Sequence, residues 1–348
     1  MKLFELAMRM RRWTAVGIAS LTAAGSVASA GAAQVIKLTT LAPKDHSFHR
    51  SLLKMGQTWR QISGGQVDLI VYPGGIQGGE AAMVDRMNIN QVQAAMLTAV
   101  GLAEIEPDVS GLQNMPMMFR DFAEVDYVQS ELRPRLEKQM RAKGYVVLFW
   151  ADTGWVRFFS RSPAVRPDDF RRLKMFTWAG HSAQVDIMKE SGFRPVPLET
   201  SDILVSLQNG LIDAVPNTPF YALYTQIYSV APHMLEIAWA PLVGATVITS
   251  RAWDRIPAAW QPEFQKAAAA AGQEIRAAGR AEGDQAVRTM KEKWGLKVHA
   301  MTPEIEAEWR QLAEGIYPKI RGAIVPVEIF DEVQRKLATY RAERAGSP

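Results

Sequence analysis

The chain has 348 residues, of which 48% are hydrophobic, 9% aromatic and 22% charged. This ordinary globular composition excludes wholesale disorder, collagen-like repeats and a polytopic membrane protein, and the length suits two domains. The net charge is +4, but four basic residues and one acidic residue lie within positions 1–30, so the remainder carries 36 basic and 35 acidic residues. Because no basic stripe is present, we expect no nucleic-acid partner.

The N-terminus has the pattern of a signal peptide. A short basic region is followed by a small, apolar stretch that ends in Ala28-Ser29-Ala30. This order predicts a secretory signal over 1–30, cleaved after Ala30 or Ala33, and a periplasmic protein of a Gram-negative bacterium. A membrane anchor is the alternative, but the stretch is rich in Gly, Ser and Thr and falls short of the roughly 20 strongly apolar residues of a span. The adjacent Arg11 and Arg12 leave the Sec and twin-arginine routes both open.

The chain contains no cysteine. Disulfides, thiol nucleophiles, thiolate metal sites and a lipid-modified cysteine are therefore excluded. Two sizeable lobes can be stable on their hydrophobic cores alone, whereas a small secreted scaffold cannot. We expect no stable membrane insertion after signal cleavage, because no later segment approaches the ~18 uninterrupted apolar residues of a membrane span.

Strands and helices alternate along the chain. Apolar runs and helical periodicity predict strand 35–41, helix 48–62, strand 67–72, helix 80–90 and strand 92–97. A second unit comprises strands 145–150, 157–160 and 172–178, helices 182–191 and 201–209, and strand 212–215. One or two long helices are expected over 253–293, with further helices at 303–318 and 327–344. This order indicates right-handed βαβ units and an α/β fold with two lobes, mixed and mostly parallel sheets, and a helical C-terminal tail.

Catalytic signatures are scarce. The chain lacks the G-x-S-x-G, phosphate-loop, H-E-x-x-H and C-x-x-C motifs. Gly74, Gly75, Gly78 and Gly79 do not have dinucleotide-binding spacing and suit a turn before a helix. His46 and His49 have the spacing of metal ligands on one helix face, but without a further strong ligand a polar helix start explains them better. We expect neither an enzyme nor a cofactor.

Four segments resemble one family of transport proteins, and no single one is decisive. They are Val71–Met83, with its Pro-Gly-Gly turn; Leu112–Asp121, similar to L-P-F-L-F-R-D; Val165–Phe176, similar to P-x-D-L-K-G-L-K-x-R; and Leu207–Asn217, similar to L-Q-x-G-x-V-D-G-x-x-N. Their order resembles that of the extracytoplasmic solute receptors of tripartite ATP-independent periplasmic (TRAP) transporters, the DctP-like family, over about 35–340.

The resemblance implies a two-lobed receptor that closes on a small organic ligand and delivers it to the membrane permease subunits of a TRAP transporter. Lobe I is expected to comprise 34–153 and about 242–285, and lobe II 154–241 and about 286–345 with the C-terminal helices. Crossing strands between the lobes form a natural hinge. A cleft at the carboxyl ends of the strands is also where open α/β sheets bind ligands.

The resemblance also places candidate ligand-binding residues. Family receptors hold a carboxylate with the arginine of the L-K-x-R strand, where this chain has Phe176, and a supporting arginine position falls at Val156, next to Arg157. Asn217 keeps its family identity, while Leu41 and Thr98 occupy positions that are polar in the family. With two tryptophans at the expected cleft edges, the candidate set is Leu41, Thr98, Trp155, Arg157, Phe176, Trp178 and Asn217.

Apolar residues therefore stand where polar anchors are expected. Burying an unpaired carboxylate against Phe and Trp is costly, so we expect a ligand that is largely apolar or uncharged. The alternative is a conventional organic-acid receptor that uses Arg157, which requires a strand shift or bulge because adjacent strand residues point to opposite faces. An exported enzyme on this scaffold, a periplasmic partner-binding protein, a metal-assisted site and the oligomeric state stay open at this stage.

Overall fold

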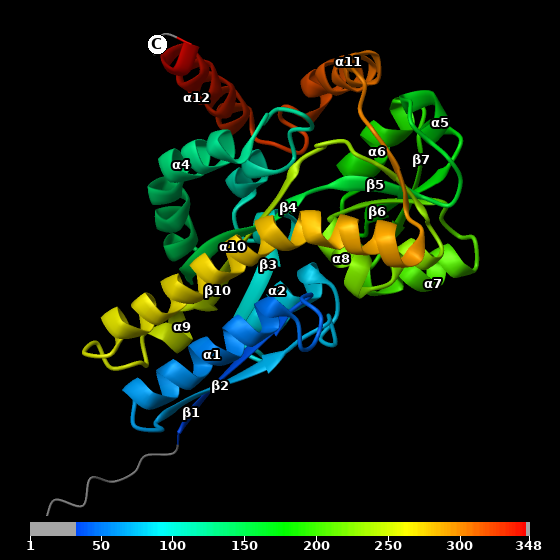
Figure 1. Cartoon of the computed structure of the whole chain (residues 1–348). Coiled ribbons are helices and arrows are strands. Elements are labelled where there is room, and N and C mark those ends of the chain that lie inside the picture. The colour runs from blue at the N-terminus through cyan, green and yellow to red at the C-terminus, as the bar shows by residue number, and fades with distance from the viewer. Residues whose placement is uncertain (1–32, 346–348) are drawn as a thin grey trace, which may run out of the picture. The chain divides into compact units, whose positions relative to one another are not determined.

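Two mixed β-sheets organise residues 33–345, the part of the chain that this computed structural model describes (Figure 1). The strands are β1 (Gln34–Thr40), β2 (Val67–Tyr72), β3 (Ala94–Thr98), β4 (Tyr145–Trp155), β5 (Arg157–Ser160), β6 (Lys174–Trp178), β7 (Arg194–Leu198), β8 (Ala214–Asn217), β9 (His233–Leu235), β10 (Pro241–Thr249) and β11 (Lys297–His299). One sheet has the order β2-β1-β3-β10-β4, and the other β11-β9-β5-β8-β6-β7. The predicted signal peptide, 1–30, lies outside the described residues.

Helices pack on both faces of each sheet. They are α1 (Ser47–Ile62), α2 (Glu80–Asn88), α3 (Ala99–Ala103), α4 (Phe122–Ala142), α5 (Pro167–Arg171), α6 (Ser182–Glu190), α7 (Ile203–Gln208), α8 (Pro219–Tyr224), α9 (Ser250–Trp253), α10 (Gln261–Trp294), α11 (Pro303–Ile320) and α12 (Val327–Ala345). Each sheet has one apolar core on either face, built from strand residues and the covering helices. The expected α/β fold class with two mixed sheets and C-terminal helices is confirmed.

Parallel pairing follows the predicted βαβ order, and antiparallel strands complete each sheet. Strand β1 is parallel to β2 and β3, and β6 is parallel to β7 and β8. Strand β10 lies antiparallel between β3 and β4, and β5 lies antiparallel between β8 and β9. The carboxyl ends of β1 and β3 in one sheet, and of β6 and β8 in the other, therefore carry the loops that can meet across a cleft.

Within 33–345 the chain passes between the sheets three times, and two of these passages are hydrogen-bonded to each other, while the third is helix α10. Strand β4 continues into β5, and β9 leads back to β10. Between them, the amide of Val156 donates to the Ala240 carbonyl at 2.9 Å, and the amide of Trp239 donates to the Val156 carbonyl at 3.2 Å. We call the part around the five-stranded sheet lobe I and the part around the six-stranded sheet lobe II. The residue boundaries expected for the lobes stay a prediction.

Helices α10 and α12 each connect the two lobes or pack away from their neighbours in the sequence. Helix α10 contributes Phe264 and Ile275 to a core of lobe I and Met290 to a core of lobe II, so one helix spans both lobes (Figure 1). Helix α12, predicted as part of lobe II, packs Phe330 and Leu337 into a core of lobe I. Within 33–345, no helix is both long enough and apolar enough to cross a membrane.

Candidate ligand-binding cleft

A cleft of about 100 Å³ lies where the strand ends of the two lobes meet. From lobe I it is lined by residues after β1, at the end of β3, at the start of α2 and along β4 and β10. From lobe II it is lined by the ends of β6 and β8 and by α8. Its lining includes Leu41, Glu80, Thr98, Phe149, Thr153, Trp178, Asn217, Thr218, Phe220, Tyr221 and Leu242. We call this cavity the cleft.

The cleft is largely apolar and has no cation in its lining. Leu41, Phe149, Trp178, Phe220 and Leu242 supply most of its walls. None of the described residues that line it is Lys, Arg or His. Such a lining stabilises apolar ligand surface by burial and, through the aromatic rings, by stacking.

Glu80 is the one carboxylate among the described residues of the lining, and its oxygens are already hydrogen-bonded. Oε1 accepts from the Thr98 amide at 2.6 Å, and Oε2 accepts from the Thr98 hydroxyl at 2.6 Å and the Gly101 amide at 3.0 Å. Burial raises the pKa of Glu80, although these three donors act in the opposite direction. Glu80 therefore fixes the turn between β3 and α3. Because the Thr98 hydroxyl already donates to Glu80, it is not free to donate to a ligand.

Neutral polar groups complete the lining. The buried Oγ1 of Thr153 has no hydrogen-bond partner anywhere in 33–345. Asn217, 5% exposed, accepts the Thr218 amide on Oδ1 at 2.8 Å, which leaves its amide nitrogen as a donor at the end of β8. Burial raises the pKa of Tyr221 to about 12, so its hydroxyl stays protonated; it lies 3.4 Å from the Thr200 carbonyl. These groups can orient a ligand through neutral hydrogen bonds.

The lobes touch at the start of α2. Gly79 is the N-cap of α2 and has no side chain to cap the helix. A Cβ atom at Gly79 would lie 1.8 Å from Oε2 of Glu199, which follows β7 in lobe II. The carboxylate of Glu199 thus sits against a helix N-terminus of the other lobe, where negative charge is stabilised.

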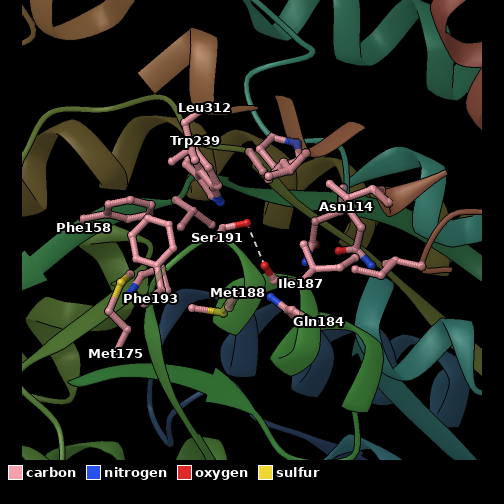
Figure 2. Close-up of a pocket in the computed structure, with 18 of the residues that line it drawn as sticks. Asn114, Phe158, Met175, Gln184, Ile187, Met188, Ser191, Phe193, Trp239 and Leu312 are labelled. Atoms are coloured by element: carbon pink, nitrogen blue, oxygen red, sulfur yellow. Dashed lines mark hydrogen bonds between the residues drawn. The ribbon is translucent and has the colours of Figure 1, made fainter. Parts of the chain in front are cut away.

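A second cavity, of about 130 Å³, lies between the six-stranded sheet, α6 and α11, and residues 113–116 of lobe I line one side of it. Figure 2 shows the rings of Phe158, Phe193 and Trp239 on one side of it and the amide groups of Asn114 and Gln184 on the other. Other lining residues are Met175, Phe176, Trp178, Ile187, Met188, Trp309, Leu312 and Ile316. We call it the lobe II cavity.

Arg157 and Trp155 lie elsewhere, in a recess beside α10. The ring of Trp155 packs 5.2 Å from that of Phe122. Arg157 Nη1 donates to the Glu236 carbonyl at 3.1 Å, and burial lowers the pKa of its guanidinium. Arg157 is nevertheless the direct cross-strand partner of Asn217 in the β5–β8 ladder, so the two side chains leave the sheet on the same face.

The predicted site residues thus fall into three groups. Leu41, Thr98, Trp178 and Asn217 line the cleft together. Phe176 is fully buried in a core of lobe II, with its ring 5.2 Å from that of Trp178, and it lines the lobe II cavity. Trp155 and Arg157 line the recess beside α10. Ligand contact by any of the seven stays a prediction.

Sequence reasoning missed Glu80, Thr153 and Tyr221. Glu80 and Tyr221 each stand just inside a helix that follows a strand end, a position that the strand predictions could have flagged. Thr153 gave no such signal, because the strand that carries it was predicted to end at 150, whereas β4 runs to Trp155.

The histidine pair has a structural explanation. His46 Nδ1 accepts the Phe48 amide at 3.2 Å and so caps α1, while Nε2 lies 3.0 Å from Oε2 of Glu282. Burial, with smaller contributions from Arg50 and His49, lowers the pKa of His46 to about 3, so the ring is neutral. Across residues 33–345, no three His, Asp or Glu side chains gather closely enough to hold a metal ion.

Comparison with known proteins identifies the family. The sequence profile of the bacterial extracellular solute-binding proteins, family 7 (DctP), matches residues 38–322. The C4-dicarboxylate-binding periplasmic protein DctP of Rhodobacter capsulatus is 24% identical over 311 residues, which cover 88% of this chain and 92% of that protein. The 2,3-diketo-L-gulonate-binding periplasmic protein of Escherichia coli is 25% identical over 273 residues, covering 77% and 80%.

Solved structures share the fold. The sugar acid binding protein of Advenella mimigardefordensis, in complex with galactonate, superposes with a TM-score of 0.81 at 16% identity and covers 88% of this chain and 99% of its own. A TRAP periplasmic solute binding protein of Sulfurospirillum deleyianum with bound succinate gives a TM-score of 0.78 at 22% identity, covering 87% and 99%. The family match over 38–322 shows that the chain belongs to the family 7 bacterial extracellular solute-binding proteins (DctP), which are transport proteins and not enzymes.

Proposed function

We propose that this receptor works in the periplasm, binds a small organic solute in the cleft and delivers it to the membrane subunits of a TRAP permease. The observation that supports this proposal best is the cleft itself, which is lined by strand ends of both lobes. A solute held there contacts both lobes at once, so its binding favours the closed arrangement in which they meet.

The lining favours a solute that is largely apolar or uncharged. The described lining carries no basic side chain, and its polar groups are threonine hydroxyls, an amide, a tyrosine and the already bonded Glu80. A carboxylate in this space has no ion-pair partner within the cleft, and desolvating an unpaired charge is costly. Thr153, Asn217 and Tyr221 are the groups that we expect to orient an uncharged polar end.

An organic acid is the second candidate, and the relatives support it better than they support an uncharged solute. Those relatives are described as binding C4-dicarboxylate, 2,3-diketo-L-gulonate, galactonate, galacturonate or succinate. Arg157 is the cation nearest to this role, since it faces Asn217 across the β5–β8 ladder and donates to a neutral carbonyl. A changed rotamer of Arg157 would have to bring its guanidinium from the recess to the cleft.

Native mass spectrometry of the protein purified from periplasm tests both candidates. A co-purifying molecule, released on denaturation and identified, is expected to be a small organic solute, and its charge decides between the two classes. Arg157→Met should weaken binding of an acid about ten-fold or more, as expected for loss of a charge-assisted hydrogen bond. Arg172→Met, which removes an exposed lobe II arginine, is the matched control. An acid whose affinity is equal in both variants would remove Arg157 from the site, and a protein that binds no small molecule would contradict the receptor proposal.

A further inference from the structure

The lobe II cavity has the size and lining of a binding site for a neutral group. None of the described residues that line it is ionisable, and its walls are mostly aromatic, methionine and branched aliphatic side chains. Several of its lining side chains, among them Gln184, Phe193 and Leu312, are only half-buried, so a ligand can reach it from the surface. Its volume of about 130 Å³ is close to that of the dry apolar cavity of about 150 Å³ that takes up benzene.

Trp178 connects this cavity with the cleft. It is the one described residue that lines both spaces. Trp178 is the last residue of β6, and Gly180, with φ +87°, turns the chain immediately afterwards. The indole therefore lies at the carboxyl end of the strand. The indole is half-buried, with Phe176 against it on one side. A change in its side-chain rotamer would therefore join two spaces that it now separates.

The two spaces also differ in what they can bind. The cleft offers hydrogen-bonding groups at Thr153, Asn217 and Tyr221. In the lobe II cavity, Gln113 and Ser191 are already bonded to the Val243 amide and the Ile187 carbonyl. Its other polar side chains among the described residues are the amides of Asn114 and Gln184, which lie across from aromatic rings (Figure 2). A molecule that reaches from one to the other would need a polar end and an apolar end.

We propose that the lobe II cavity is an apolar subsite for the transported solute, with Trp178 as the partition between it and the cleft. The inference rests on the receptor function proposed above. The polar end of the solute lies in the cleft beside Asn217, and a hydrocarbon or aromatic group no larger than a benzene ring lies behind Trp178. The solute class is thus amphipathic, whether its polar end is an acid or an uncharged group.

Two homologous series probe this arrangement, the n-alkanamides from acetamide to octanamide and the matching n-alkanoates. Their affinities are measured by isothermal titration calorimetry. Each methylene that enters the cavity should raise the affinity about four-fold. The increase should end once the chain fills a space the size of a benzene ring. Xenon, diffused into crystals of the wild-type protein, should occupy the lobe II cavity, because it needs no contact with the polar groups of the cleft.

Cavity-filling variants test whether the gain in affinity with chain length arises in the lobe II cavity. Leu312→Trp fills the cavity from α11 and Met188→Trp fills it from α6, whereas Gln311→Trp and Lys189→Trp add the same bulk at exposed neighbouring positions. The filled variants should bind short members as tightly as wild type and should lose the gain with chain length. The two controls should keep it. Circular dichroism and thermal melting verify that each variant folds; if one filled variant does not, the other and the wild-type xenon measurement decide.

Each other outcome counts against the inference. Short members that bind with no gain from added methylenes would refute the subsite and leave the receptor function intact. If the gain in affinity persists in the filled variants, the alkyl chain of the ligand binds elsewhere. A cavity without xenon would show that no apolar guest enters it. If neither series binds, the proposed solute classes and this inference fail together.

Discussion

The charged cluster between α10 and β4 gives a stability prediction with a definite size. Arg280 donates to Asp152 at 2.7 to 3.2 Å and to Asp126 at 2.6 and 2.9 Å. The side chain of Asp152 is 1% exposed, whereas that of Asp126 is 41% exposed. Arg280→Met keeps an apolar stem of similar length but leaves the buried carboxylate of Asp152 without its principal partner.

Removing one partner of a buried ion pair costs about 3–5 kcal/mol. Two features of this site reduce that cost. Arg276 Nε lies 3.8 Å from Oδ2 of Asp152 and can partly replace the lost cation, and Arg280 itself is 24% exposed. Loss of the cation–π contact with Phe122, at 4.3 Å, adds a smaller cost. We expect Arg280→Met to lower the free energy of unfolding by about 2–3 kcal/mol.

Urea unfolding followed by circular dichroism measures this loss. Arg288→Met, an exposed arginine on the same helix, is the control and should change stability by less than about 0.5 kcal/mol. Adding Asp152→Asn to Arg280→Met should restore part of the loss, because it removes the charge that was left buried. A loss below about 1 kcal/mol for Arg280→Met, the range of exposed pairs, would refute this reasoning, as would an absence of coupling between the two substitutions.

Two further predictions concern the start of α2. Because folding raises the pKa of Glu80, its contribution to stability is fully present below the unfolded pKa of about 4.3 and is lost as the pH rises through the raised folded value. Glu80→Gln should abolish this part of the pH dependence of unfolding, whereas Asp85→Asn, exposed on the same helix, should not. If stability depends on pH equally in both variants, Glu80 is not the group responsible. Gly79→Ala should displace Glu199 and weaken closure, which reduces solute affinity about two- to five-fold and enlarges the radius of gyration in X-ray scattering. Glu199→Ala should act in the same direction, and unchanged scattering and affinity in both would show that the contact does not hold the lobes together.

Local signals predicted several elements close to their observed bounds, but not every element with such a signal was recognised. Helix α1, predicted from 48 to 62, begins at Ser47 because His46 supplies the cap, and β2 was predicted with its observed bounds. Helix α4 was not predicted, although Asp121, whose side chain accepts the Glu124 amide, is a recognisable helix start. Strand β10 was also missed, although the β-branched run over 242–249 is a strand signal; only its antiparallel place between β3 and β4 depends on long-range pairing.

The candidate site shows the same division between local and long-range information. Asn217 and Thr98 were placed by the family resemblance, at positions that also lie at strand ends, and both line the cleft. Phe176 has an ordinary strand position, but which face of the sheet it buries depends on helices far away in sequence, and the structure packs it into an apolar core. The direction of Arg157 into the recess follows from its bond to Glu236, which lies 79 residues away.

The edge of the lobe II sheet limits how these molecules can associate with one another. Strand β7 forms one edge and contains Pro195 and Pro197, two residues apart, so both prolines lack an amide hydrogen on the same side of the strand. The other edge, β11, has only 3 residues. An incoming strand from a second molecule would find few donors on either edge, so this sheet is a poor template for edge-to-edge aggregation, even when the protein is concentrated or incompletely folded.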